Sequence, residues 1–292
     1  MTFPISGVTV SPLVPFSVAY FVSLVMSTGG ISGAFLLLPF QVSVLGFSGP
    51  AVTATNHLFN VVAIPSGVYR YVREKRMVWP LTAVIVAGTV PGVVVGSLAR
   101  IYLLPDPRHF RVFMGLVLLL IGSRLLAKLL SGRRDSESGP ANGGFEVRIL
   151  RFDWRRVEYE FQGTRHGVST PALAALTAVV GIIGGAYGVG GGAIIAPFLV
   201  SLFRLPVHSI AGATLLGTCL TSIVGVGFFA VVTPLLGQGN VSPDWALGLL
   251  FGTGGLLGMY SGARLQRFLP ARAIESILGV AVTGLALSYV FW

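Results

Sequence analysis

Long uncharged runs are the feature that most constrains what this chain can fold into. Residues 1–69 contain no Lys, Arg, Asp or Glu, and four further uncharged runs cover residues 77–99, 166–203, 205–243 and 245–263. A transmembrane helix needs about 20 consecutive, mostly apolar residues, whereas the core of a water-soluble protein does not need uncharged runs of this length. We therefore expect an integral membrane protein. Apolar and polar residues do not alternate along these runs, which argues against a membrane β-barrel.

The composition also excludes several classes of function. The net charge is +10, but 9 of the 20 basic residues lie between Arg124 and Arg165, where acidic residues are interspersed, so we expect no nucleic-acid partner. The single cysteine, Cys219, lies inside an apolar run, so neither a disulfide nor a thiolate metal site is expected. No cofactor is predicted. No basic segment precedes the first apolar run, so a cleaved signal peptide is not expected either.

Dividing the runs at their Gly, Pro and His positions predicts an all-α membrane protein with about eight transmembrane helices. The expected spans are 13–45, 50–71, 78–103, 110–130, 170–203, 207–234, 243–268 and 271–291. Four spans form a first transmembrane repeat, residues 1–131, and four form a second, residues 170–292. Residues 132–169 carry charges and turn residues and then alternate apolar and polar side chains, so we expect a charged extramembrane loop that contains a small hairpin.

The two halves repeat one another, which is a common design of secondary transporters. A shift of 158 residues needs no gap to place Gly30 on Gly188, Asn56 on Thr214 and Asn60 on Thr218. Later in each half the shift becomes 164, which places Arg100 on Arg264. Four full crossings per half would make both halves enter the membrane in the same direction, and an odd number would invert one of them. With four crossings, the distribution of Lys and Arg favours both termini inside.

Each half has a glycine-rich break in its first span, at residues 29–33 and 184–192. Such clusters either let helices pack closely or interrupt the helix and free backbone N–H groups for a ligand at mid-membrane. Because the two breaks occupy matched repeat positions and each is followed by a proline, we favour a ligand site. The candidate residues of the breaks are Gly30, Ser32, Gly33, Gly190, Gly191 and Gly192.

The second span of each half supplies neutral hydrogen-bonding side chains. Asn56 and Asn60 lie one helical turn apart, as do Thr214 and Thr218, so each pair shares a helix face. Thr55 belongs to the same group of candidates, and bonding between helices is the alternative role for all five. A half-helix that begins after a break directs its positive end toward the protein centre, and no acidic residue lies within the uncharged runs. We therefore expect the substrate to be a small anion.

Two further possibilities involve His57, which follows Asn56. An imidazole can carry a coupling proton, although a packed histidine is the simpler explanation. Gly30-Ile31-Ser32-Gly33 also resembles the Gly-x-Ser-Gly string of a serine nucleophile, so an intramembrane hydrolase using Ser32 and His57 is an alternative. Against that alternative, the repeat partner of Ser32 is Gly190. We expect no enzyme activity, and an anion channel or scaffold is the third class considered.

These segments together resemble the TauE/SafE sulfite-exporter family of membrane permeases. The resemblance covers nearly the whole chain except residues 131–169, and it rests on segments 29–40 and 184–198, 51–60 and 209–218, and the small-residue stretches that end at Arg100 and Arg264. It implies an eight-helix secondary transporter in a bacterial inner membrane that moves small sulfur-containing or organic anions, such as sulfite, sulfonates, sulfoacetate or related carboxylates. Its expected partners are that anion and the lipid bilayer, and a homo-oligomer is possible. The long charged segment between the halves departs from the family pattern.

Overall fold

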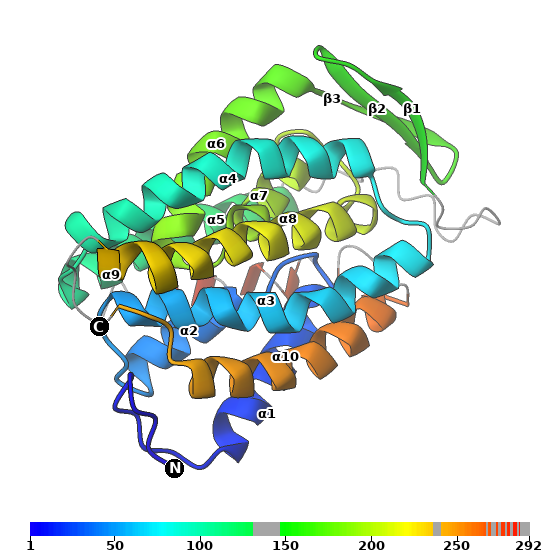
Figure 1. Cartoon of the computed structure of the whole chain (residues 1–292). Coiled ribbons are helices and arrows are strands. Elements are labelled where there is room, and N and C mark those ends of the chain that lie inside the picture. The colour runs from blue at the N-terminus through cyan, green and yellow to red at the C-terminus, as the bar shows by residue number, and fades with distance from the viewer. Residues whose placement is uncertain are drawn as a thin grey trace.

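The computed structural model describes residues 1–130, 147–235, 241–266 and part of 268–286, and the last expected helix, residues 271–291, lies largely outside them. The described elements are mostly helical (Figure 1). In chain order they are α1 Leu13–Ser27, α2 Ala34–Ser43, α3 Pro50–Arg73, α4 Trp79–Tyr102, α5 Pro107–Leu130, β1 Val147–Phe152, β2 Arg156–Phe161, β3 Thr164–Ser169, α6 Thr170–Tyr187, α7 Gly191–Ser201, α8 Val207–Gly227, the π-helical turn η1 Phe228–Val232, α9 Thr233–Leu235 and α10 Trp245–Gln266.

Four of the helices in the described part of the chain are long and apolar enough to cross a membrane. They are α4, α6, α10 and the continuous segment Val207–Val231, which joins α8 to η1. The helices α1, α2 and α7 are apolar but shorter. Proline marks the start of several helices, since it occupies the first or second position of α3, α4 and α6, where its missing N–H has no intrahelical partner to lose.

The segment between α5 and α6 forms a three-stranded antiparallel sheet, in the order β1-β2-β3, where the sequence predicted a hairpin. The sheet contacts one end of the helix bundle. The Val147 amide donates to the Lys75 carbonyl at 3.1 Å, and the Tyr159 hydroxyl lies 2.8 Å from that of Ser209. We call the end of the helix bundle that the sheet contacts the sheet end. The opposite end, which holds the starts of α3 and α10, is called the far end, and Figure 1 shows the helices stretched between the two.

The helices α1, α3 and α10 all run from the far end to the sheet end. Along α10, Gly254, Gly258 and Gly262 pack in turn against Phe16, Tyr20 and Leu24 of α1, so the two helices are parallel. Contacts of α10 with α3 also advance together, from Gly248 against Leu58 to Gly252 against Val62. The four-residue glycine spacing lets the backbones approach closely, as in other membrane helix pairs. Because α1 and α3 run in the same direction, the intervening residues, which include α2, must return to the far end.

A second group of helices, α4, α6 and α8, shows the same arrangement in the opposite direction. Contacts between α4 and α6 advance in parallel, from Gly88 against Thr177 to Gly96 against Ala186. The helix α8 is antiparallel to α3, since Gly212 packs against Tyr71 and Gly225 against His57. The helices α4, α6 and α8 therefore all run from the sheet end to the far end, and α7 must return to the sheet end.

Each first span is thus a helical hairpin rather than one interrupted crossing helix. The hairpin α1–α2 enters from the far end, and the hairpin α6–α7 enters from the sheet end. The expectation that both halves enter in the same direction assumed four full crossings per half and is wrong, because a hairpin is not a full crossing; the alternative of an odd number of crossings, which inverts one half, applies instead. A hairpin returns to the side from which it came, so the matched segments of the two halves run in opposite directions.

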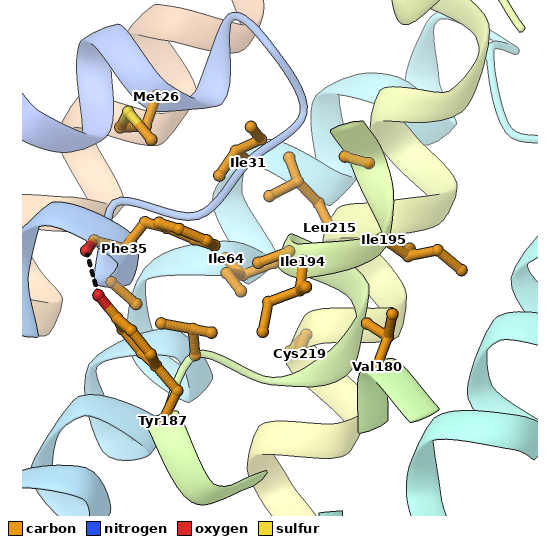
Figure 2. Packing of buried hydrophobic residues seen from close by; sticks show 14 of the residues in the cluster. Met26, Ile31, Phe35, Ile64, Val180, Tyr187, Ile194, Ile195, Leu215 and Cys219 are labelled. Atoms are coloured by element: carbon orange, nitrogen blue, oxygen red, sulfur yellow. Dashed lines mark hydrogen bonds between the residues drawn. The ribbon is translucent and has the colours of Figure 1, made fainter. Parts of the chain in front are cut away.

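The hairpin tips meet in the apolar core. Figure 2 shows Ile31 from the first hairpin, Tyr187 from the second and Ile64 of α3 gathered in one packed region. The rings of Phe35 and Tyr187 stack with centroids 5.6 Å apart, and the Tyr187 hydroxyl donates to the Phe35 carbonyl at 3.3 Å. Aromatic pairs of this kind add to the free energy gained from burial, so they hold the two tips against each other.

Candidate functional site

The two breaks predicted from the glycine clusters are present in the structure. The first break, residues 28–33, separates α1 from α2, and the second break, residues 188–190, separates α6 from α7. Gly30 has φ +69°, Gly188 has φ +85° and Gly190 has φ +73°. Residues with a Cβ are strained in this left-handed region. Glycine is therefore required at these positions to turn the chain.

Asn56 of α3 joins the two breaks. Its Nδ2 donates to the carbonyl of Ala34, the first residue of α2, at 3.1 Å and to the carbonyl of Gly188 at 3.0 Å. Its Oδ1 accepts from Nε2 of Gln41 at 3.2 Å. The Asn56 side chain is fully buried. Both of its amide protons are thus used, and each is donated to a backbone carbonyl of a different hairpin.

Asn60, one turn further along α3, makes a second connection of the same kind. Its Nδ2 donates to the carbonyl of Val189 in the second break and to the hydroxyl of Ser222 on α8, both at 3.1 Å. Its Oδ1 accepts a short hydrogen bond from the Ser32 hydroxyl of the first break. Ser32 Oγ also accepts from the Ala34 amide at 3.2 Å, so it provides a partner for the first amide of α2.

Thr214 of α8 holds the first break from the other side. Its hydroxyl lies 2.8 Å from the Gly30 carbonyl and also within reach of the Ile210 and Ala211 carbonyls of its own helix. The backbones at Gly30 and at Ala211 are so close that a Cβ on Gly30 would overlap that residue. The loop and α8 are therefore fixed together by both packing and a hydrogen bond.

The remaining candidate glycines lie where the breaks and the start of α7 pack against other helices. A Cβ on Gly33 would meet Ser23 of α1, a Cβ on Gly191 would meet Thr89 of α4, and a Cβ on Gly190 would meet Thr221 and Ser222 of α8.

Thr218 packs against Gly192, but its hydroxyl donates to the Thr214 carbonyl of its own helix at 2.8 Å. Thr55 lies apart from the breaks. Its hydroxyl donates to the Ala51 carbonyl and accepts from the Asp244 amide, both at 2.8 Å, so it joins α3 to the start of α10.

His57 lies at the edge of this cluster. Its Nδ1 is 3.2 Å from the Ser222 hydroxyl, and its Nε2 makes no hydrogen bond of standard geometry, although the Gly185 carbonyl interacts with the ring. The ring also faces Phe229 of the π-helical turn η1, with centroids 6.4 Å apart, and π-helical turns are frequent at functional sites. Ser32 bonds to Asn60 instead of to His57, so the described structure does not form the dyad that a hydrolase would need.

The electrostatic character of the centre is set by neutral donors. Asp244, the buried carboxylate among the described residues, lies at the far end, where it accepts from the Ser6 amide at 2.9 Å and from the Leu247 amide of α10 at 3.1 Å. The helices α2 and α7 both begin at the breaks, and a helix start carries a partial positive charge.

Gln41 was not predicted as part of the site, although an amide inside an apolar helix is a signal that could have identified it.

The sequence as a whole matches known proteins. The family model for the sulfite exporter TauE/SafE matches residues 16–289. The chain belongs to the TauE/SafE family. A probable membrane transporter protein of Xylella fastidiosa is 27% identical over 270 residues, which cover 90% of this chain and 88% of the relative. The probable membrane transporter protein YunE of Bacillus subtilis is 24% identical over 220 residues, covering 74% and 72%.

A third relative matches a shorter region. The probable membrane transporter protein YdhB of Bacillus subtilis is 32% identical over 93 residues, which cover 32% of this chain and 35% of YdhB. No solved structure matches. Together with the apolar helices, membership in this TauE/SafE family identifies a multi-pass membrane transporter, whose matched relatives are bacterial.

Proposed function

We propose that this protein is a secondary transporter that carries a small anion, such as sulfite, a sulfonate or sulfoacetate, by alternating access. The observation that carries the proposal is the position of Asn56, whose side chain bonds at once to Ala34 in the first hairpin and Gly188 in the second. Two oppositely oriented hairpins that meet at one polar side chain form a site that can be opened from either side. Broken helices of this kind bind substrates and ions near the midplane of transporters with inverted repeats.

The charge distribution supports an anion as the substrate. The starts of α2 and α7 direct partial positive charge toward the centre. The side chains that surround them, such as Asn60, Ser32 and Ser222, are neutral and can donate hydrogen bonds. A carboxylate would favour a cation at the centre, but the buried carboxylate in the described structure, Asp244, lies at the far end.

The mechanism follows from which bonds connect the halves. The amide groups of Asn56 and Asn60 now donate to the backbone carbonyls of Gly188 and Val189. The same donors can transfer to the oxygen atoms of an anion, which frees the second hairpin to move relative to α3. Opening on one side then requires the bond between Thr214 and Gly30 to be kept, and opening on the other requires it to break. His57, which shares Ser222 with Asn60, is a candidate for proton coupling.

Counterflow of labelled sulfite in proteoliposomes tests this proposal. Purified protein is reconstituted with unlabelled sulfite inside, and uptake of labelled sulfite is measured with unlabelled sulfonates, sulfate and small carboxylates as competitors. Saturable uptake that one competitor blocks supports a carrier and identifies its ligand class. Uptake that does not saturate indicates a channel, and no exchange with any of these anions overturns the proposal.

A further inference from the structure

Arg100, in the last turn of α4, is a buried cation at the edge of the candidate site. Its side chain is fully buried. The Nε donates to the Thr53 hydroxyl at 3.1 Å, the Nη1 makes a short hydrogen bond to the Leu104 carbonyl, and the Nη2 is buried without a hydrogen-bond partner. The guanidinium carbon lies 3.8 Å from the centroid of the Phe110 ring.

No carboxylate balances this charge in the described part of the chain. The other buried arginine, Arg76 at the sheet end, provides a contrast, because its Nη1 lies 2.9 Å from Oε2 of Glu74. Arg264, the repeat counterpart of Arg100, is exposed to the surroundings of the protein. Charged side chains within membrane-spanning helices are costly and are generally retained for function. A buried guanidinium with an N–H that has no acceptor, and with no carboxylate beside it, is suited to bind an anion.

Arg100 is connected to the second break through one residue. Thr53, which accepts from Arg100, packs directly against Gly188, where a Cβ would lie 2.9 Å from the Thr53 Cα. Gly188 is the residue whose carbonyl accepts from Asn56. Arg100 therefore lies on the far-end side of the break, immediately behind the contact that joins the two hairpins.

We propose that Arg100 binds the transported anion and supplies the positive charge that the neutral centre lacks. This inference rests on the proposed function and specifies its substrate class as an oxyanion with at least two oxygen atoms that can face the guanidinium together, as a sulfite, sulfonate or carboxylate can. The planar guanidinium of arginine matches such groups with two parallel hydrogen bonds. The free Nη2 provides one of them, and Nη1 provides the other when it leaves the Leu104 carbonyl.

A purely structural role for Arg100 makes a different prediction. Cations often bind the last carbonyls of a helix, and the bond to Leu104 together with the Phe110 contact fits that role. In that case, replacing Arg100 would lower the thermal stability of the protein whether or not an anion is present. If Arg100 is an anion-binding group, its removal relieves an unbalanced buried charge, so the anion-free protein keeps its stability and loses its response to the anion.

The test compares wild type with Arg100→Gln, Arg100→Lys and the matched control Arg264→Gln. The midpoint of thermal unfolding is measured in detergent without anion and with sulfite or sulfoacetate, and sulfite counterflow is measured in proteoliposomes. We expect Arg100→Gln to keep the anion-free midpoint, to lose the shift caused by the anion, and to raise KM at least tenfold. Arg100→Lys keeps the charge without the planar fork, so its KM rises severalfold, and Arg264→Gln behaves as wild type.

Two outcomes separate this inference from the proposed function. If wild type responds to an anion and Arg100→Gln responds equally, with an unchanged KM, Arg100 is not in the site while the transporter proposal stands. If wild type responds to none of the anions, the proposed function fails and this inference fails with it. Should Arg100→Gln not fold, Arg100→Lys decides, because a wild-type KM in that variant overturns recognition by a planar fork.

Discussion

The side chain of Asn56 donates to the Gly188 carbonyl at 3.0 Å, and the residue 158 positions later, Thr214, bonds to the Gly30 carbonyl at 2.8 Å. Gly30 and Gly188 are themselves 158 positions apart, and both have positive φ. Each long helix that follows a hairpin thus holds the hairpin tip of the other half. This reciprocal arrangement couples the two breaks, because neither tip can move without disturbing a bond to the opposite half.

Replacing Asn56 with alanine is expected to abolish anion counterflow and to lower stability. The change leaves the carbonyls of Ala34 and Gly188 and the amide of Gln41 without their partner. Each buried polar group that loses its hydrogen bond costs about 1–3 kcal/mol. We therefore expect a lower midpoint of thermal unfolding in detergent together with loss of sulfite counterflow. Counterflow at the wild-type rate in Asn56→Ala would remove Asn56 from the site.

The two threonines of α8 should respond differently to substitution by valine. Thr214→Val removes the bond to Gly30 in the opposite half, whereas Thr218→Val removes only a bond within its own helix. A net hydrogen bond is worth about 1 kcal/mol, so Thr214→Val should slow counterflow roughly fivefold to tenfold. Thr218→Val has almost the same shape and should stay within about twofold of wild type. Equal effects of the two changes would argue against a special role for the bond between the halves.

Adding a methyl group at Gly188 should prevent correct assembly of the second break. Gly188 has φ +85°, and its Cβ would overlap the Thr53 backbone of α3. The left-handed conformation alone costs a residue with a Cβ about 1–2 kcal/mol, so Gly188→Ala should give little folded protein. Gly227, at the end of α8, has nothing within 4 Å of its Cβ position. Gly227→Ala should therefore leave the yield and elution profile in gel filtration unchanged, and equal losses in both variants would refute this explanation.

Much of the candidate site could be predicted from the sequence because its signals are local. The glycines at 30 and 188 mark backbone conformations that other residues avoid, and Asn56 and Asn60 are amides within an apolar segment that must find partners. The role of Thr55 could not be predicted in this way, because its partner, Asp244, comes 189 positions later and is brought close only by the fold.

The direction of the hairpins could not be predicted from the sequence for a related reason. An uncharged run of 13–45 is long enough for either a crossing helix or two shorter helices that fold back, and apolarity does not distinguish them. The distinction depends on contacts such as Gly258 against Tyr20, which show that α1 is parallel to α10. The burial of Arg100 could not be predicted either, because it depends on Thr53 and Phe110, which lie on two other helices.

The inverted hairpins change the expected orientation in the membrane. The N-terminal residues and the sheet lie at opposite ends of the bundle, since Ser6 bonds to Asp244 at the far end while β1 bonds to Lys75 at the sheet end. The sheet end carries many more basic residues than the far end, where Arg100, Arg108 and Arg111 lie. Basic segments stay on the cytoplasmic side. We therefore predict that the sheet faces the cytoplasm and the N-terminal residues face outward, in contrast to the expectation that the termini are inside.

Labelling of single cysteines in intact cells measures this orientation. Cys219 is buried in α8, so a Cys219→Ser background provides a chain without other thiols. Into it are introduced Thr9→Cys and Thr164→Cys, both at exposed positions at opposite ends of the bundle. A membrane-impermeant maleimide should label Thr9→Cys in intact cells and Thr164→Cys only after the cells are opened. Labelling of both variants without opening the cells would contradict the inverted arrangement itself. The reverse pattern would keep the inverted arrangement and overturn only the assignment of sides, because the hairpin directions do not depend on which end is basic.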